Sequence, residues 1–296
     1  MRLPDFIRNF LADPPPDYVF EISAGGVAWA RGSGDEAGFE PLDADVLDIS
    51  PMSDNLLKPE ALEEVARKLF GESSSKKARK TAALILPDYC ARIAVLDFDA
   101  FPAKPEEQLA LVKFRMKKSV PFDVDAAVVS YFAQPRHDAP KKFDVVVTVA
   151  ALEIVSRYEA PFRAAGFDVG LVTVSSLAMA DLLPQVQTVA CAKLSGRVMS
   201  LTIASHGAIK MVRCVELPSL TEDDISSVLY PTFAYMEDEL KARPQRLFLA
   251  GFGDWAIYVG PRVEAELRVV AEQLPSRFGQ PDAQNAGLLG YLEARR

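Results

Sequence analysis

Short apolar runs alternate with longer stretches of helical spacing along this chain. Apolar residues two apart between small-residue turns are typical of strands, and apolar residues three and four apart are typical of amphipathic helices. The predicted strands cover residues 18–22, 27–31, 46–49, 82–87, 92–99, 128–133, 143–151, 167–174, 188–194, 198–204, 209–215 and 246–251. The predicted helices cover residues 59–70, 105–118, 152–165, 221–241 and 287–295, with one more that has Pro261 in its first turn.

This pattern divides the chain into two similar halves with a smaller unit between them. Each half opens with a hairpin around a small-residue turn, in "DYVFEISAGGVAWARG" (17–32) and in "ACAKLSGRVMSLTIA" (190–204). A later strand of the second half runs into Gly251-Phe252-Gly253. Between the halves, helix, strand, strand, helix and strand follow one another over residues 105–174. The pattern therefore predicts an α/β fold of two lobes with an inserted α+β module.

Composition narrows the class of protein. The 296 residues are 49% hydrophobic and 25% charged, as in a soluble globular protein long enough for two packed lobes. The net charge of −8 argues against general affinity for nucleic acid, because the summed field repels polyanions. Cys90, Cys191 and Cys214 lie in apolar runs, and we expect buried free thiols. With only two histidines, neither a zinc site nor a catalytic triad is expected.

The first segment, "MRLPDFIRNFLADPPP" (1–16), places an apolar stripe on one face of a helix that the prolines end. It either docks on its own domain or contacts a membrane surface or a partner. No run is long enough to span a bilayer, and no leader peptide is evident, so we expect a cytoplasmic protein. The stripe consists of Leu3, Phe6, Ile7, Phe10 and Leu11.

Two hairpins at the start of two lobes, with a glycine turn after a later strand, are the topology of the actin-like ATPases. The run "LPDYCARIAVLDFDAFPAKPEEQLALVKFRMKKSVPFDVDAAVVSY" (86–131) resembles the type IV pilus assembly protein PilM family. "LYPTFAYMEDEL" (229–240) resembles the long helix of that family's second lobe. The resemblance runs through nearly the whole chain from Tyr18 onward.

This resemblance implies an actin-like fold in which the inserted module replaces one actin subdomain, as in FtsA. The expected division is an amphipathic segment (1–16), the first lobe (17–100), the inserted module (101–174) and the second lobe (175–296), whose last helix packs back on the first. The resemblance also implies a cytoplasmic scaffold of the pilus inner-membrane platform. Its implied partners are the cytoplasmic tail of a PilN-like membrane protein and the pilus motor ATPases, and association with the membrane would run through such partners. The cytoplasmic domain of GspL, from type II secretion, is a related alternative.

Departures from the family pattern bear on nucleotide binding. Where nucleotide-binding members have Asp-x-Gly-Ser-Ser-Ser-x-Lys, this chain has Glu21 and, in place of the lysine, Ala28. In the second hairpin the Asp-x-Gly pattern aligns with Lys193-Leu194-Ser195, so a cation replaces the acid that orients magnesium. The degenerate nucleotide site thus comprises Glu21, Ser23, Ala24, Gly25, Gly26, Lys193, Ser195, Gly196, Gly251, Phe252 and Gly253.

Three readings of this site stay open: ATP turnover, nucleotide binding without hydrolysis, and a nucleotide-free structural cleft, which the substitutions favour. We therefore expect no catalytic residues, no metal and no cofactor, with ATP and magnesium as the alternative. A further hypothesis is an ion pair between Glu21 and Lys193 where metal and phosphate would otherwise sit. An actin-like sugar or acetate kinase needs an acid and intact phosphate loops that the aligned positions lack, whereas a filament-forming protein remains an alternative.

Capture of a tail peptide would need a groove where the inserted module meets the first lobe. An extended peptide adding to a strand edge there would gain backbone hydrogen bonds and apolar pockets. The alternative is that the three aromatic candidates are core residues, and that the basic end of helix 105–118 only complements the helix dipole. The candidate contacts are Arg92, Phe98, Phe114, Arg115 and Phe122.

Overall fold

The structure of the chain, a computed structural model, describes residues 15–32, 34–52, 54–71, 79–136, 142–239, 241 and 243–295. The chain divides into two compact units, Met1–Val174 with Arg295 and Ser175–Ala294 with Arg296. The predicted helix over residues 1–16 lies almost wholly outside the described residues.

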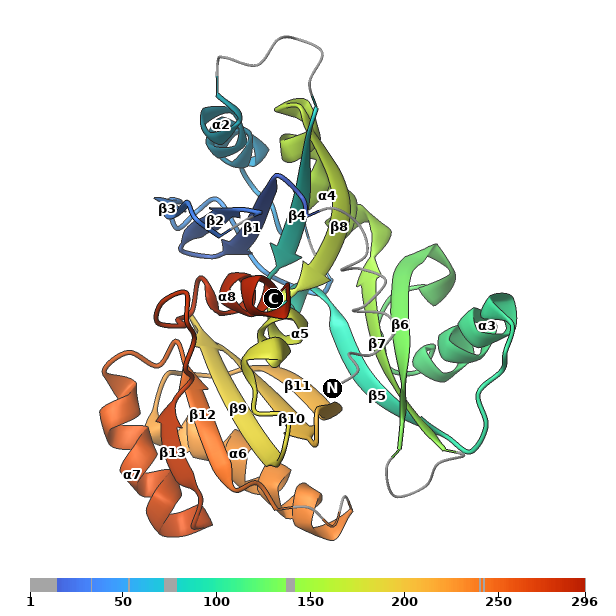
Figure 1. Ribbon diagram of the computed structural model, residues 1–296, viewed down its shortest axis with the longest axis vertical. Coiled ribbons are helices and arrows are strands. Elements are labelled where there is room, and N and C mark those ends of the chain that lie inside the picture. Colours follow the sequence, from blue (N-terminus) through green and yellow to red (C-terminus); the bar gives the residue numbers. More distant parts are fainter. Residues whose placement is uncertain are drawn as a thin grey trace. The chain divides into compact units, whose positions relative to one another are not determined.

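The first unit is built on a five-stranded sheet with the strand order β3-β2-β1-β4-β8 (Figure 1). Its first three strands form antiparallel hairpins, whereas β1, β4 and β8 run parallel. Parallel neighbours need crossover connections, which the intervening helices supply. The strands are β1 (Tyr18–Ser23), β2 (Gly26–Arg31), β3 (Ala37–Pro41), β4 (Lys80–Leu86) and β8 (Phe167–Val174).

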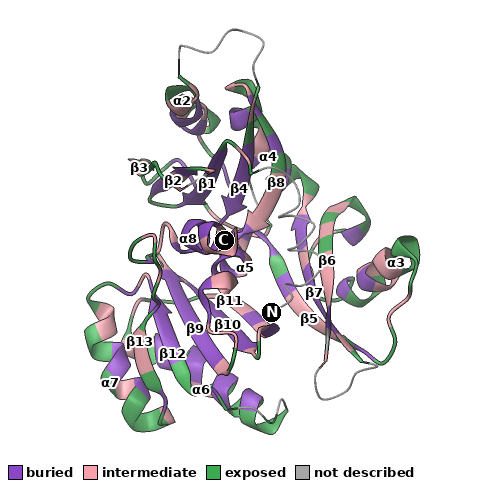
Figure 2. Cartoon of the chain, viewed as in Figure 1, coloured by how far each residue is buried: buried purple, intermediate pink, exposed green. Residues whose placement is uncertain are grey.

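Two helices pack beside this sheet. Helix α4 (Leu152–Ala164) packs on β8, and α2 (Pro59–Phe70) packs on α4. An aromatic cluster forms beneath them because β1 turns its apolar side chains toward α4. The rings of Phe20 and Phe162 lie 4.8 Å apart, and those of Phe20 and Phe167 lie 5.2 Å apart. Purple strands flanked by mixed helices in Figure 2 show where this core lies.

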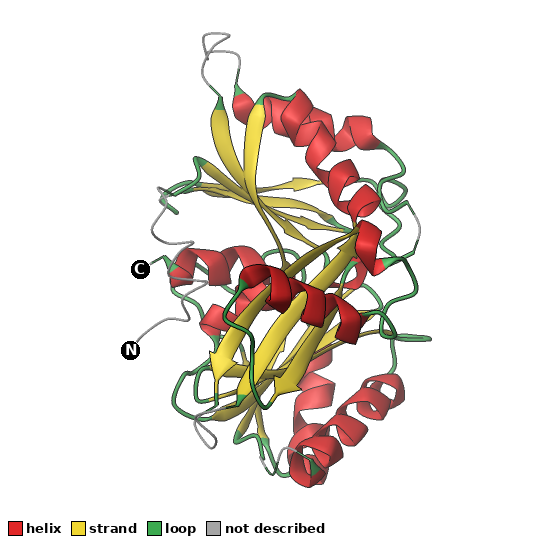
Figure 3. Ribbon diagram, turned by 90° about the vertical axis from the view of Figure 1, so that its right-hand side faces the viewer, coloured by secondary structure: helices red, strands yellow, loops and turns green. Residues whose placement is uncertain are grey.

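The inserted module is a separate three-stranded antiparallel sheet of order β5-β7-β6, formed by β5 (Arg92–Phe98), β6 (Ala127–Pro135) and β7 (Phe143–Ala151). Helix α3 (Pro105–Met116) lies across one face of this sheet (Figure 3) and buries Val112 and Met116 against it. The predicted bounds 101–174 need correction. Strand β5 pairs only within the module, whereas β8 pairs with β4 of the larger sheet.

The second unit repeats the first unit's strand order in the sheet β11-β10-β9-β12-β13. Three antiparallel strands, β9 (Thr188–Ser195), β10 (Val198–Ser205) and β11 (Ala208–Glu216), are joined by two-residue turns. Strands β12 (Arg246–Ala250) and β13 (Val270–Gln273) then run parallel to β9. The same mixed pattern thus appears in both units.

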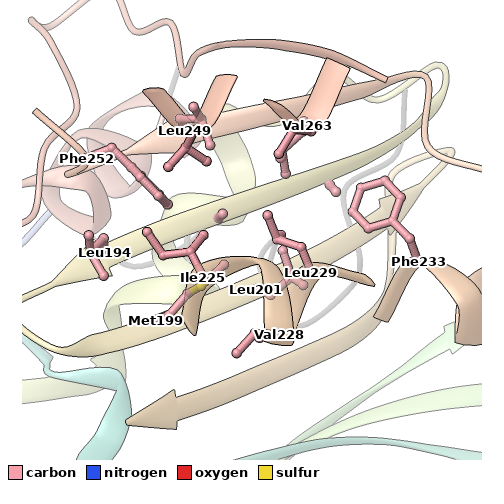
Figure 4. Close-up of a cluster of buried hydrophobic side chains, with 14 of the residues drawn as sticks. Leu194, Met199, Leu201, Ile225, Val228, Leu229, Phe233, Leu249, Phe252 and Val263 are labelled. Carbon is pink, nitrogen blue, oxygen red and sulfur yellow. The ribbon is translucent and has the colours of Figure 1, made fainter. Parts of the chain in front are cut away.

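Helices cover both faces of the second sheet. On one face, α6 (Glu222–Asp238) and α7 (Trp255–Leu267) close a core that includes Leu201, Leu229 and Phe252 (Figure 4). On the other face, α5 (Ser175–Met179), a 3-10 turn (Ala180–Leu182) and α8 (Ala286–Ala294) pack together. The crossing is close, because a Cβ atom at Gly290 would overlap the carbonyl oxygen of Ala178. The last helix therefore packs within its own unit.

Three local predictions were wrong. Residues 46–49 form no strand and contribute only an isolated bridge between Leu47 and Leu56. Pro261 lies inside α7, which begins earlier, at Trp255. Strands β3 and β13 were not predicted, since both are short and gain their stability from pairing with a neighbouring strand.

Candidate functional site

The turn of the first hairpin is closed by its own neighbours. Strands β1 and β2 meet at the pair Ser23 and Gly26, with Ala24 and Gly25 exposed between them. The Ser23 hydroxyl donates to the carbonyl of Gly26 at 3.0 Å, and the amide of Leu42 donates to the carbonyl of Gly25 at 3.1 Å. A phosphate would need donors aimed outward from this turn. The Ser23 hydroxyl points back into the turn instead.

Position 26, directly after this turn, accepts only glycine. Its φ of 151° lies in a region that side chains disfavour, and a Cβ atom there would overlap the carbonyl oxygen of Glu40. The ring of Phe39 would lie 2.5 Å from the same atom. Glycine at this position therefore makes room for strand β3, and this packing explains the glycine without any ligand.

The turn of the second hairpin, at Gly196 and Arg197, is open above its glycine. Gly196 has φ of 59°, and no heavy atom lies within 4 Å of a Cβ built there. Arg197 is held by its own unit, because its guanidinium lies 2.6 Å from the Glu216 carboxylate and donates to the carbonyl of Pro218 at 3.1 Å. Ser195 ends β9 directly before this turn.

Glu21 and Lys193 occupy equivalent positions in the two sheets. Each stands two residues before the end of the first strand of its unit, and each is buried, with 1% and 3% of its surface exposed. The Lys193 ammonium donates to the hydroxyl of Ser175, the first residue of α5. An acid and a base therefore stand where the two phosphate-binding hairpins of an ATPase would each carry an acid. The pairing of Glu21 with Lys193, which belong to different units, stays a prediction.

The third element, Gly251-Phe252-Gly253, serves the packing of the second unit. Gly251 has φ of 73°, and a Cβ atom there would overlap the carbonyl oxygen of Leu194 and lie 2.9 Å from the backbone of Ala283. Phe252 is 3% exposed and lies in the core with Leu194 (Figure 4). The glycine thus admits the unit's own backbone, so its presence gives no support to an adenosine site. Gly253 alone of the three is open, with φ of 50°.

The five predicted peptide contacts do not gather at one place. Phe98 is buried in the core of the module, where the Arg115 guanidinium lies 5.1 Å above its ring, and Phe122 packs against the same core. Arg92 is exposed at the other end of β5 from Phe98, about 20 Å away by strand rise. Phe114 is 75% exposed, on the side of α3 away from the sheet. Phe98 is therefore a core residue, as the alternative held.

Two residues that the sequence did not single out stand out in the second unit. Ser175 accepts the hydrogen bond of Lys193, a contact between residues 18 apart in the sequence. Burial raises the pKa of the Asp181 carboxyl from 3.8 to about 7. Neither role could be predicted from residue spacing in the sequence, because each depends on how α5 and the turn after it pack beneath the sheet.

The described residues contain neither a metal-binding cluster nor a membrane-spanning helix. No three His, Cys, Asp or Glu side chains among them come together as a metal site. Cys90 and Cys191 are buried and Cys214 is half-buried, and none of these three described cysteines forms a disulfide. None of the described helices has the length and apolar character to cross a membrane.

Comparison with solved structures identifies the class of fold. A Bacteroides thetaiotaomicron protein with an actin-like ATPase fold and unknown function matches 94% of this chain and 96% of its own, at 13% identity and a TM-score of 0.54. The chain therefore has an actin-like fold, as predicted. No family model matches the sequence, and no curated protein matches it.

A more specific likeness is to the PilM–PilN type IV pilus biogenesis complex. A chain of that complex matches 96% of this chain and 100% of its own, at 16% identity and a TM-score of 0.71. The predicted resemblance to PilM is thereby confirmed in the fold. The likeness includes the inserted module, since little of either chain lies outside the matched part.

Proposed function

We propose that this protein is a PilM-like scaffold of a type IV pilus inner-membrane platform and that it binds the cytoplasmic tail of a PilN-like membrane protein. The observation that supports this most is the match over the whole of a chain from the PilM–PilN complex. The protein would work in the cytoplasm and reach the membrane through its partners, with pilus motor ATPases as a further contact.

We further propose that the protein binds no magnesium nucleotide and therefore does not hydrolyse ATP. Phosphoryl transfer needs a magnesium ion held beside the phosphates and donors aimed at them. Lys193 places a buried cation at the position of the metal-orienting acid, and the Ser23 hydroxyl donates within its own turn. The Lys193 cation would therefore repel the metal ion of a magnesium-bound triphosphate. The phosphates would also lack a hydrogen bond from the Ser23 hydroxyl.

Binding of a fluorescent ATP analogue with magnesium tests this part of the proposal. We expect no saturable binding below a dissociation constant of about 1 mM. The matched variants are Lys193→Ala and Arg213→Ala, the second of which removes a cation from β11 of the same sheet. Micromolar binding by the parent protein that Lys193→Ala abolishes and Arg213→Ala keeps would show that Lys193 holds a nucleotide.

Tail capture is tested with a synthetic peptide of the cytoplasmic tail encoded by the neighbouring membrane-protein gene. Of the candidate contacts, Phe114 offers an exposed aromatic ring, and we expect Phe114→Ala to weaken binding about tenfold. Tyr258→Ala, which removes a 59% exposed ring from α7 of the other unit, is the control and should bind normally. The scaffold proposal fails if the parent protein shows no binding by calorimetry at high peptide concentration.

A further inference from the structure

Helix α7 exposes apolar side chains on the side that faces away from its own sheet (Figure 2). Ile257 is 69% exposed, and Tyr258 next to it is 59% exposed. Pro261 and Ala265, one and two turns after Ile257, are exposed as well. Side chains four residues apart lie on the same face of a helix, so these residues form a continuous surface. This surface, the α7 stripe, consists of Ile257, Tyr258, Pro261 and Ala265.

The stripe has the character of an interaction surface. Single exposed apolar side chains are ordinary, whereas several that share one face of a helix mark a site where another molecule packs. Tyr258 is also ordered by its neighbour, because its ring lies edge-on to that of Trp255 with the centroids 6.4 Å apart, and Trp255 packs against the core. An aromatic side chain that is already ordered loses little conformational freedom on binding.

Pro261 adds a hydrogen-bond acceptor to the stripe. It lies inside α7, and a proline has no amide hydrogen, so the carbonyl of Ile257 lacks the donor that a helix normally supplies four residues later. Covering such a carbonyl is costly unless the covering group donates a hydrogen bond to it. A purely apolar occupant of the stripe is therefore disfavoured.

Acidic side chains lie on both sides of the stripe. Toward β13, the Glu264 carboxylate accepts from the amide of Ala271 at 3.1 Å. Toward α6, the Arg262 guanidinium lies 2.9 Å from the Asp223 carboxylate and 3.3 Å from the Glu266 carboxylate, so one cation is shared among several acids. Over the start of α6 and over α7 with its N-cap, the acids are Glu222, Asp223, Asp224, Asp254, Glu264 and Glu266, and the bases are Arg262 and Arg268.

This excess of negative charge distinguishes between the possible occupants. An anionic membrane surface would be repelled, and a second copy that packed stripe against stripe would bring like charges together. A partner that carries lysines and arginines beside apolar side chains would be attracted. The side chains of Lys and Arg only donate hydrogen bonds, so one of them can also satisfy the carbonyl of Ile257. The charge and the unsatisfied acceptor thus favour the same occupant.

We propose that the α7 stripe is the docking surface for a cationic amphipathic helix of a partner protein. The apolar side chains of that helix pack along Ile257, Pro261 and Ala265, since ridges of every fourth residue are the usual contact between helices. Its lysines and arginines face the acids on either side, and one of them donates to the carbonyl of Ile257. The stripe lies in the second unit, whereas the candidate tail contacts lie in the first, so the proposal does not depend on tail capture.

Two synthetic amphipathic helical peptides test this surface by calorimetry with the full chain. One is built from Leu and Lys, and the other has Glu in place of every Lys. We expect the Lys peptide to bind with a dissociation constant of about 100 μM and the Glu peptide not to bind measurably. Salt should weaken the binding, because it screens the acids around the stripe. Equal binding of the two peptides would overturn the proposal.

Ile257→Ser locates the binding on the stripe. We expect it to weaken binding of the Lys peptide at least about tenfold, because it removes the most exposed apolar side chain of the stripe. Val270→Ser is the matched control, since it removes a 56% exposed apolar side chain from β13, outside the stripe, and it should leave the affinity unchanged. Equal weakening by both variants would contradict docking on α7.

Pro261→Ala separates docking from a merely structural role. The change supplies an amide hydrogen to the carbonyl of Ile257 and removes a proline from a helix interior, so we expect the protein to become more stable. Binding of the Lys peptide should nevertheless weaken about threefold, because the acceptor is then occupied. A more stable protein with unchanged affinity would show that the carbonyl has no part in binding and would overturn that part of the proposal.

Sedimentation of the full chain and its binding to vesicles of anionic lipid examine the other occupants. A dimer, or vesicle binding, that Ile257→Ser abolishes would assign the stripe to a second copy or to a membrane and overturn the proposal. Phe114→Ala, at the exposed tail candidate in the first unit, should leave binding of the Lys peptide unchanged. A protein that binds the Lys peptide through Ile257 and fails to bind the tail peptide would refute the scaffold proposal and support this one.

Discussion

The two units have the same strand order, yet the hairpins that open them have taken different roles. Beside the turn between β1 and β2, strand β3 packs against Gly26, the first residue of β2, and this glycine cannot accept a side chain. The turn between β9 and β10 is open, and its Gly196 meets nothing. An identical topology therefore imposes a two-residue turn on both hairpins, while the local packing decides how strictly each turn needs glycine.

The same contrast holds for the residues two positions before the end of each unit's first strand. Glu21 and Lys193 are both buried on the first strand of their sheets, but they carry opposite charges. A buried charge is costly unless it is bonded, and Lys193 meets this cost through Ser175 at the beginning of α5. The second unit has therefore used this position to tie its central strand to the helix that follows the division between the units.

Exchanging glycine for alanine in the two turns should give the largest difference between the hairpins. Gly26→Ala would place a Cβ atom against the backbone of β3, and we expect it to lower the free energy of unfolding by about 4 kcal/mol. Gly196→Ala meets only the cost of a left-handed residue, about 1 kcal/mol. Urea unfolding followed through Trp29 and Trp255, one in each unit, measures both. Equal losses would show that the covering of the first turn has no energetic weight.

The second unit should also respond to pH through Asp181. Burial raises the pKa of this carboxyl to about 7, so between about pH 4 and 7 the folded chain keeps a proton that the unfolded chain releases. Stability of the unit therefore falls as the pH rises through this window, by up to about 4 kcal/mol, and levels off above it. Unfolding followed through Trp255 should show this fall in the parent but not in Asp181→Asn. Parallel curves for the two proteins would contradict the shift.

The fold was predictable where its signals are local. The hairpins around Gly25 and Gly196, and the strands on either side of Asp88, follow from small-residue turns between apolar runs. Strand β3 could not be predicted, since "AGFEP" has weak strand propensity and forms through its pairing with β2. The division between module and sheet was also missed, because strand partners are a non-local choice that periodicity does not encode.

The candidate site was predictable in its positions and less so in its contacts. Alignment with the ATPase pattern located Lys193 at the place equivalent to Glu21, and the structure puts both on matching strands. The contact of Lys193 with Ser175 depends on the packing of α5 and could not be predicted from the sequence. The outward position of Phe114 was within reach, because it stands two residues from both Val112 and Met116, which are buried.

A double-mutant cycle between Ser175→Ala and Lys193→Met should measure the tie within the second unit. We expect a coupling energy of about 2 kcal/mol, since hydrogen bonds to a buried charged group are among the stronger ones. Unfolding followed through Trp255 in a Trp29→Phe background supplies the four stabilities. Ser176→Ala, at the next position on α5, provides the matched control cycle, and equal coupling there would show that the effect is not specific to Ser175.

A cycle between Glu21→Gln and Lys193→Met addresses the predicted ion pair between the units, and its expected coupling is smaller, about 1 kcal/mol. The reason is that Lys193 already donates to Ser175 and so has less to gain from a second partner. If the predicted ion pair forms, reversing both charges, Glu21→Lys with Lys193→Glu, should recover part of the stability that either change alone removes, because an opposite pair of charges is restored. Additive losses in both cycles would show that the two hairpins carry their buried charges independently, each satisfied within its own unit.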